Sequence, residues 1–451
     1  MKPIPGGSDR KVTATRLPLI EIGPGETLPP LPKTAWLEVD LDALVANVRL
    51  LQGLLPAGVR VEPVVKADAY GHGAVAVARA LVAAGVGSLS VATFDEALEL
   101  RQAGIEVPIL IVFPIPPELA PEARRYDLSV TVGDDVLLAR TLAALAADRG
   151  ADAGARDGAP AAEVTPDRPL AIHLEIETGL GRGGVDPGAA PEAAAAIQAS
   201  PDARLAGLWS HLQAADDADN AAGQDRRFGI AAGLLEAAGI SLPSRHLAAS
   251  GGLLAGHVGV HDVVRVGMAQ YGVVPDGLTV AERVLPSAAG LRPVMSLRAL
   301  PIRVAWLEAG SGVSYGPTFT TSRRSRIATL PLGYADGYAR NLSNRAEVLV
   351  RGVRVPQVGT VAMDAVMVDV TDVPGPEVTV DDVFTLLGEQ GGDRIDAQEV
   401  ARWGNTISYE VLAAMSARLP RVYYAAAKAV GLRTVACATS RSGGTLDVRP
   451  V

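Results

Sequence analysis

The sequence predicts an α/β fold, namely a (β/α)8 barrel of the TIM type followed by a mostly β C-terminal domain. Of the 451 residues, 48% are hydrophobic, which is enough for a large buried core. Eight short apolar segments alternate with Ala- and Leu-rich helical sequence; this alternation implies parallel pairing, and eight units imply a closed barrel. Beyond about residue 290, strand-like segments follow one another with few helices between them. An open doubly wound sheet is the alternative for the first part.

The barrel domain is predicted over residues 34–289, after an extended arm of residues 1–33 that is rich in Pro and Gly. It opens with a short strand, a helix N-cap at Asp40 and an amphipathic helix. Residues 147–168 have low complexity and are expected to form a flexible insertion. The eight strands are expected within residues 59–66, 87–94, 107–113, 128–132, 170–177, 205–212, 245–250 and 262–267.

The second domain is predicted over residues 290–425. Its last segment, ISYEVLAAMSARL, predicts a helix, and the tail at 426–451 is expected to be disordered. Its strands are expected within residues 295–306, 326–332, 346–352, 365–370 and 383–388.

Composition excludes several classes of protein. The net charge of −9, from 41 basic and 50 acidic side chains, argues against a nucleic-acid partner. The single cysteine, Cys437, allows no intrachain disulfide and gives little support to a cysteine nucleophile or a metal site. Neither a secretory signal nor an apolar stretch of about 18 residues is visible, so a cytoplasmic protein with no membrane partner is expected.

Chemistry-bearing residues collect where the predicted barrel strands end, which is the face that carries the active sites of such barrels. A lysine follows the first strand, and the last two loops carry the Ser and Gly that often cradle a phosphate. With an arginine beside them, these groups suggest pyridoxal 5'-phosphate held as a Schiff base. Taken singly, each could be a salt-bridge partner or a core residue. The set consists of Lys66, Arg182, His211, Ser250, Arg265 and Gly267.

Nine motifs, in the same order, resemble those of alanine racemase. The resemblance covers roughly residues 33–425. It implies the barrel and β domain inferred above, pyridoxal 5'-phosphate as cofactor, and a head-to-tail homodimer in which the partner's β domain completes each active site. The implied reaction interconverts the small-molecule substrates L-alanine and D-alanine, the latter for cell-wall synthesis. The motifs are VVKADAYGHGA, ETGLGRGG, WSH, HLAAS, VRVGMAQYG, VSYGPTF, PLGYADGYAR, VGTVAMDAVMVD and NTISYEVLAAMSARLPRVY.

Two bases are expected, because racemisation removes a proton from one face of the α-carbon and returns one to the other. By resemblance, Lys66 binds the cofactor and serves one face, and Tyr315 of the other subunit serves the opposite face. The resemblance also implies a chain from the cofactor's pyridine nitrogen through Arg265 and His211 to Tyr315. An arginine can only donate to that nitrogen, which favours racemisation over transamination.

The remaining site residues are carried over from the same motifs. Tyr70, Ser250, Tyr409 and the N–H groups of Gly267 and Met268 are expected at the phosphate. Arg182 and the N–H of Met363 are expected at the substrate carboxylate, and Arg182 also at the phenolic oxygen of the cofactor. Asp216, Tyr334 and Tyr409 are expected to narrow the entrance. The chain departs from the common pattern of the family at three positions, and these differences bear on the range of substrates. The positions are Ala249, Thr360 and Ala362.

Glu175 is a further candidate. Period-two alternation places His173, Glu175 and Glu177 on one face of the fifth strand. Many alanine racemases carry at the position of Glu175 a lysine whose carbamylated side chain orients the arginine equivalent to Arg182. An encoded carboxylate is expected to hold Arg182 without bound carbon dioxide; an ordinary barrel salt bridge is the alternative.

Three other functions are alternatives to alanine racemisation. The one most similar to it is a racemase of the same fold that acts on a broader range of amino acids. A pyridoxal-phosphate decarboxylase of the same architecture would carry a catalytic Cys before an Asp in the β domain, which this chain lacks. A non-catalytic pyridoxal-phosphate-binding barrel would consist of a single domain, and the predicted β domain argues against it.

Overall fold

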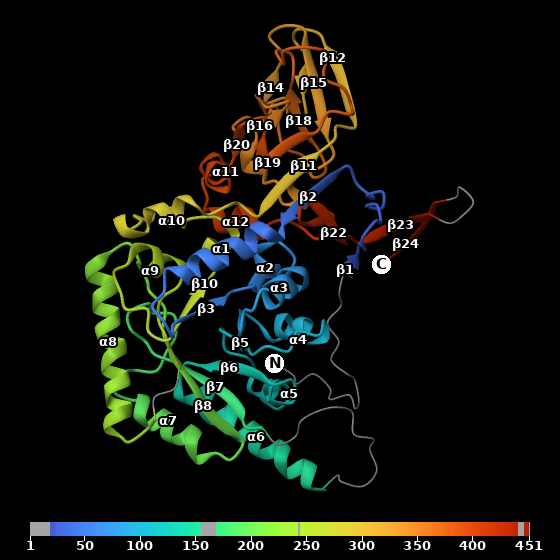
Figure 1. Cartoon of the computed structure of the whole chain (residues 1–451). Coiled ribbons are helices and arrows are strands. Elements are labelled where there is room, and N and C mark those ends of the chain that lie inside the picture. Colours follow the sequence, from blue (N-terminus) through green and yellow to red (C-terminus); the bar gives the residue numbers. More distant parts are fainter. Residues whose placement is uncertain (1–18, 155–167, 242–243, 441–445, 451) are drawn as a thin grey trace.

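Eight parallel strands form a closed barrel in the computed structural model, which describes residues 19–154, 168–241, 244–440 and 446–450 (Figure 1). Six strands make one sheet, β10 pairs with β3, and the bridges Val64–Ser90 and Ala249–Arg265 join the two sheets into a ring. All eight predicted strands are present. They are β3 (Arg60–Pro63), β4 (Leu89–Val91), β5 (Ile109–Ile111), β6 (Leu128–Val132), β7 (Leu170–Glu175), β8 (Ala203–Trp209), β9 (Ser244–His246) and β10 (Val263–Val266).

Helices surround the ring, with buried apolar faces toward it. Helix α1 begins as predicted, because the Asp40 carboxylate accepts from the Ala43 N–H at 2.8 Å. Its Leu44 and Leu51 are fully buried. The barrel-domain helices are α1 (Leu41–Gly53), α2 (Lys66–Tyr70), α3 (Ala74–Ala83), α4 (Phe94–Gln102), η1 (Pro117–Leu119), α5 (Ala120–Arg125), α6 (Asp135–Gly154), α7 (Ala190–Ala199), α8 (Ala218–Ala237), α9 (Ser250–Ala255), η2 (Met268–Tyr271), η3 (Glu282–Val284) and α10 (Leu285–Ala289). No helix among these, or elsewhere in the described ranges, is long and apolar enough to cross a membrane.

The second domain is mostly β, as predicted, and lies at the top in Figure 1. Its largest sheet has the order β1-β22-β21-β2-β11-β19-β16-β17, with β20 on β19, beside a three-stranded sheet of order β12-β15-β18. Its elements are β11 (Met295–Ala299), β12 (Arg303–Leu307), β13 (Gly312–Val313), β14 (Phe319–Thr320), β15 (Ser325–Leu330), η4 (Tyr334–Asp336), η5 (Arg340–Leu342), β16 (Glu347–Val350), β17 (Val353–Pro356), β18 (Val366–Asp369), β19 (Phe384–Gln390), β20 (Asp393–Ile395), α11 (Ala397–Gly404), α12 (Ser408–Ala413) and β21 (Arg421–Ala425).

The N-terminal boundary of the barrel differs from the expectation. Strand β2 (Ala35–Asp40) precedes the barrel in sequence, yet it lies in the β-domain sheet between β21 and β11. Within the expected arm, β1 (Leu19–Glu21) pairs with β22 (Lys428–Arg433). Within the described residues, the chain therefore contributes β1 and β2 to the β-domain sheet before it forms the barrel, and it returns to that sheet at β11.

The C-terminal tail also differs from the expectation of disorder. Strand β22 pairs with β21 and β1, and β23 (Ala436–Ser440) pairs with β24 (Leu446–Pro450). Burial explains β22, since Leu432 is fully buried against Val422 and Ile22. Of the expected insertion, residues 147–154 belong to α6, and residues 155–167 lie outside the described residues.

Candidate active site

A cavity of about 440 Å³ opens at the carboxyl-terminal rim of the barrel. It brings together residues from six barrel units and from the β domain, as expected for a barrel active site. Asp216 and Tyr409, both expected at the entrance, also line it. The predicted residues that line the cavity are Lys66, Tyr70, Arg182, His211, Asp216, Ser250, Arg265, Gly267, Met268 and Tyr409.

Lys66 lies at the first residue of a left-handed turn. Ala67, Asp68, Ala69 and Tyr70 have φ values of 52°, 54°, 53° and 52°. For non-glycine residues this conformation costs about 1–2 kcal/mol per residue, so contacts outside the turn must stabilise it. Burial, followed by the charge of Arg182, lowers the pKa of Lys66. A larger fraction of its amine is therefore neutral, the form that can act as a nucleophile or a base.

The far side of the cavity is a compact cradle of hydrogen-bond donors. A Cβ atom at Gly267 would lie 2.6 Å from the Tyr70 hydroxyl, so only glycine lets that hydroxyl approach the backbone. The Ser250 hydroxyl accepts from the Gly267 N–H at 3.0 Å. Burial raises the pKa of Tyr70, and raises that of Tyr409 to about 12, so both phenols stay protonated and can donate. Donors of this kind beside cationic side chains fit a phosphate group.

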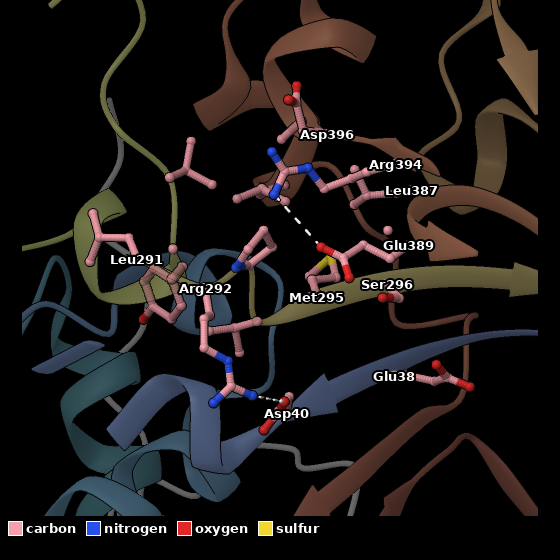
Figure 2. A pocket seen from close by; sticks show the side chains of 18 of the residues that line it. Glu38, Asp40, Leu291, Arg292, Met295, Ser296, Leu387, Glu389, Arg394 and Asp396 are labelled. Carbon is pink, nitrogen blue, oxygen red and sulfur yellow. Dashed lines mark hydrogen bonds and ion pairs between the residues drawn. The ribbon is translucent and has the colours of Figure 1, made fainter. Parts of the chain in front are cut away.

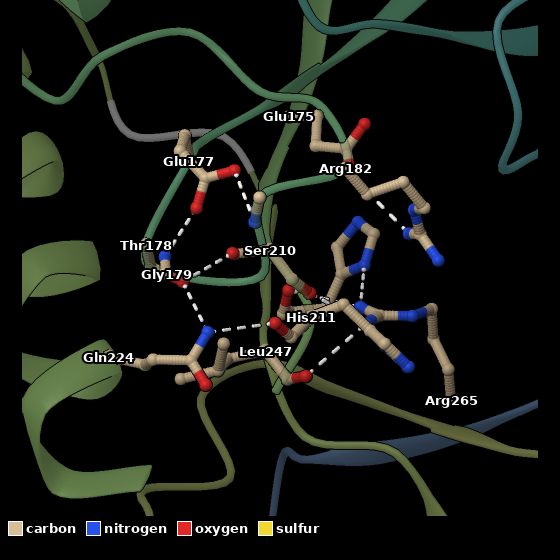
Figure 3. A network of polar contacts seen from close by, with 12 residues as sticks. Glu175, Glu177, Thr178, Gly179, Arg182, Ser210, His211, Gln224, Leu247 and Arg265 are labelled. Carbon is tan, nitrogen blue, oxygen red and sulfur yellow. Dashed lines mark hydrogen bonds and ion pairs between the residues drawn. The ribbon is translucent and has the colours of Figure 1, made fainter. Parts of the chain in front are cut away.

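Arg265 is buried, and both terminal nitrogens of its guanidinium group, Nη1 and Nη2, make hydrogen bonds. Its Nη2 donates to the Ser210 carbonyl at 2.7 Å and to the Leu247 carbonyl at 3.2 Å, and lies 3.2 Å from Nδ1 of His211 (Figure 3). Burial, then the charge of Arg265, lowers the pKa of His211 to about 3. Since arginine only donates, His211 accepts at Nδ1 and carries its proton on Nε2, which leaves one N–H to offer a partner.

The sequence analysis missed a second histidine contact of Arg265. Nη1 of Arg265 lies 2.6 Å from Nδ1 of His246, whose Nε2 lies 2.9 Å from Nδ1 of His173. Burial lowers the pKa of His246 well below its usual value and that of His173 to about 3, so both rings are neutral. The available signal was a histidine in or just beyond each of three neighbouring strands, with His173 in β7, His211 two residues after β8 and His246 at the end of β9. Phe113 was also missed; it ends the third predicted strand and lies under both Lys66 and Arg182.

Glu175 lies directly beside Arg182. Its Oε1 is 3.5 Å from Nη2 of Arg182, and the carboxylate is buried whereas the arginine is partly exposed. Burial raises the pKa of Glu175, and the charge of Arg182 opposes this. Glu177 accepts from the N–H groups of Gly179 and Gly181, which fixes the loop that carries Arg182 (Figure 3).

Besides Glu175, which lies beside Arg182, three predicted residues do not line this cavity. Tyr315, Tyr334 and Met363 belong to the β domain and are 73%, 41% and 52% exposed. They lie on connected loops, since the Tyr334 N–H donates to the Ala362 carbonyl at 3.1 Å and the Ser314 hydroxyl donates to the Thr360 carbonyl at 2.6 Å.

A larger cavity, of about 980 Å³, lies between the barrel and the β domain. Arg292 there contacts Asp40 at 3.0 Å, and Arg394 contacts Glu389 at 3.7 Å (Figure 2). None of the predicted site residues lines it. The rim cavity is therefore the candidate active site.

The fold and the rim cavity together define a two-domain barrel protein whose cavity holds a lysine of lowered pKa just beyond the first barrel strand. The family description "Alanine racemase, N-terminal domain" matches residues 39–275, and "Alanine racemase, C-terminal domain" matches residues 294–423. The chain belongs to the alanine racemase family, whose members are isomerases.

Relatives agree with this over nearly their whole length. An alanine racemase of Nostoc sp. is 38% identical over 86% of this chain and 95% of its own length, and one of Symbiobacterium thermophilum is 39% identical over 87% and 97%. The crystal structure of a Bacillus anthracis alanine racemase with bound L-Ala-P has a TM-score of 0.78 at 32% identity, covering 90% of this chain and 98% of that one. An alanine racemase from D-cycloserine-producing Streptomyces lavendulae has a TM-score of 0.76 at 35% identity, covering 88% and 98%.

Proposed function

We propose that this protein interconverts L-alanine and D-alanine with pyridoxal 5'-phosphate, as a cytoplasmic homodimer that supplies D-alanine for cell-wall synthesis. One observation carries the proposal. A lysine, a phosphate-fitting cradle and a buried Arg265–His211 pair line one cavity, whereas Tyr315 is exposed on the other domain. The membership of the family supports the reaction, and the exposed tyrosine supports a site that two subunits share.

The cavity residues fit the proposed cofactor. Ser250, Tyr70, Tyr409 and the N–H groups of Gly267 and Met268 would hold its phosphate, and Arg265 would donate to its pyridine nitrogen. When bound, pyridoxal 5'-phosphate withdraws electrons from the α-carbon and so makes its proton easier to remove. Arg265 remains cationic, since burial lowers its pKa only to about 10, so it donates without giving up a proton.

Two bases would then serve the two faces of the α-carbon. Lys66, with its lowered pKa, holds or releases a proton on one face. Tyr315 of the partner subunit would act on the other face, and the Nε2–H of His211 would donate to that phenolic oxygen and stabilise its ionised form. Arg182 and the backbone N–H of Met363 of the partner subunit would bind the substrate carboxylate. Asp216, Tyr409 and the partner subunit's Tyr334 would narrow the entrance.

An assay coupled to D-amino-acid oxidase tests the function directly. L-Ala, L-Ser, L-Lys and L-Arg are offered separately to the protein loaded with pyridoxal 5'-phosphate. We expect D-amino acid from L-Ala and little from the two long basic substrates. Comparable rates for L-Lys and L-Arg would establish a broader racemase, and no product from any substrate would refute the proposal.

Replacing Glu175 by glutamine is expected to lower kcat/KM for alanine about 10-fold. A charge-assisted hydrogen bond contributes about 1.5–3 kcal/mol, and the 3.5 Å separation from Arg182 places this one at the weak end. Because burial raises the pKa of Glu175, the neutral amide should not lower the melting temperature. Both quantities are measured on Glu175→Gln and on the exposed control Glu192→Gln.

Two outcomes bear on the role of Glu175. An unchanged kcat/KM in Glu175→Gln would show that this carboxylate does not position Arg182. The unmodified enzyme should also be indifferent to added bicarbonate, since the carboxylate is encoded, whereas Glu175→Lys is expected to respond to it.

A further inference from the structure

The left-handed turn over residues 66–70 carries two of the proposed cofactor contacts, Lys66 and Tyr70. Four consecutive non-glycine residues, 67–70, lie in the left-handed region, where side chains clash with the backbone. The turn's own backbone hydrogen bonds include those from Ala69 N–H to Val65 O at 2.9 Å, from Gly71 N–H to Ala67 O at 2.9 Å and from Gly73 N–H to Asp68 O at 2.8 Å. Something outside it must hold this conformation.

Asp68 supplies one outside contact, beside the Glu96 carboxylate, which accepts from the Ala67 N–H at 2.6 Å. The Asp68 carboxylate accepts two hydrogen bonds from the guanidinium group of Arg433, one of them 2.6 Å long, and it also accepts from the Ala74 N–H at 2.8 Å. Nη2 of Arg421 lies 3.9 Å from the same carboxylate, and Nε of Arg421 donates to the Gly71 carbonyl at 2.9 Å. Both arginines are buried. A two-pronged pair of this kind fixes orientation as well as distance.

The arginines come from the β domain, far along the chain. Arg421 begins β21 and Arg433 ends β22, and these strands pair with each other. The outer edge of β22 is covered by β1 from the N-terminal arm. Strand β1 from the N-terminal arm and strands β21 and β22 from the C-terminal part therefore pair beside the residues that contact this turn.

We propose that Asp68 and Arg433 are positioning residues that hold the turn left-handed and thereby aim Lys66 and Tyr70 into the cavity. The inference deepens the proposed function and rests on it for the roles of those two residues. An ordinary salt bridge would only add stability. We call the Asp68–Arg433 pair the clamp. If the clamp holds a strained turn in its conformation, a substitution that removes the strain should make the clamp unnecessary.

The first experiment uses the full chain without cofactor. Hydrogen exchange is followed in the segment 66–74 of the unmodified protein, of Arg433→Gln, and of Arg354→Gln, which breaks a similar two-pronged pair with Asp393 at the other edge of the same sheet. Arg433→Gln should raise exchange there about 10-fold or more, and the control should not. Unchanged hydrogen exchange of residues 66–74 in Arg433→Gln would refute the proposal that Arg433 holds the turn. Should that variant fail to fold, Arg433→Lys, which keeps the charge but not the fork, is expected to show a smaller rise.

The second experiment asks whether glycine replaces the clamp. Arg433→Gln should raise the dissociation constant for pyridoxal 5'-phosphate about 10- to 100-fold and lower kcat more than it changes KM for alanine. Ala67→Gly removes steric strain at an exposed residue of the turn. The double variant Arg433→Gln, Ala67→Gly should recover most of the cofactor affinity. Failure of this rescue would leave only a structural salt bridge and refute the inference. If the unmodified protein binds no cofactor, the proposed function fails, while the exchange experiment still decides the clamp.

Discussion

Lys66→Ala is expected to lose covalent attachment of pyridoxal 5'-phosphate and at least about 10⁴-fold in racemisation rate, because in the proposed mechanism this one residue would serve as both cofactor anchor and base. The visible absorbance of the bound cofactor should disappear with it. The fold should be retained, since the side chain projects into a cavity and makes no hydrogen bond on which the described barrel depends.

The measurement combines absorbance, the oxidase-coupled assay and borohydride reduction followed by peptide mass analysis. In the unmodified protein, reduction should attach the cofactor to the peptide that contains Lys66. Lys428→Ala, at an exposed position of β22, is the control and should behave as the unmodified protein. A fully active, yellow Lys66→Ala protein would contradict the assignment.

Tyr315→Phe is expected to lower the racemisation rate about 10²- to 10⁴-fold, because it removes one hydroxyl that can carry a proton. Cofactor binding should be unaffected, since Tyr315 is 73% exposed and does not line the cavity of its own chain. The remaining Lys66 should still exchange the α-proton on one face, so deuterium incorporation from solvent should depend on which enantiomer is supplied.

Mixing the two inactive variants tests whether two subunits share each site. A hybrid dimer of Lys66→Ala and Tyr315→Phe holds one site with both bases and one with neither. Random subunit exchange should therefore restore about one quarter of the unmodified activity, since half of the dimers are hybrids and each has one working site. If mass spectrometry verifies exchange and the mixture stays inactive, Lys66 and Tyr315 do not act in the same site.

The sequence by itself determined the order of the elements and the rim residues. Apolar segments alternate with helices, so eight strands could be located, and the carboxyl ends of parallel strands meet at one face. Lys66, His211, Ser250 and Arg265 could be assigned to one site because each lies at or just beyond its own strand. These are local properties, which hydrophobic periodicity and turn chemistry report.

Only the tertiary structure decided which distant segments pair. Periodicity marks β2 as a strand but not its place between β21 and β11. It also does not show that β22, in the tail expected to be disordered, pairs with β21 on one side and with β1 on the other. The contacts of Arg265 with His246 and of Asp68 with Arg433 join residues whose types alone permit many partners. Buried polar groups form hydrogen bonds in folded proteins. Which hydrogen-bond partner each group meets depends on how the whole chain packs, and no short stretch of sequence contains that information.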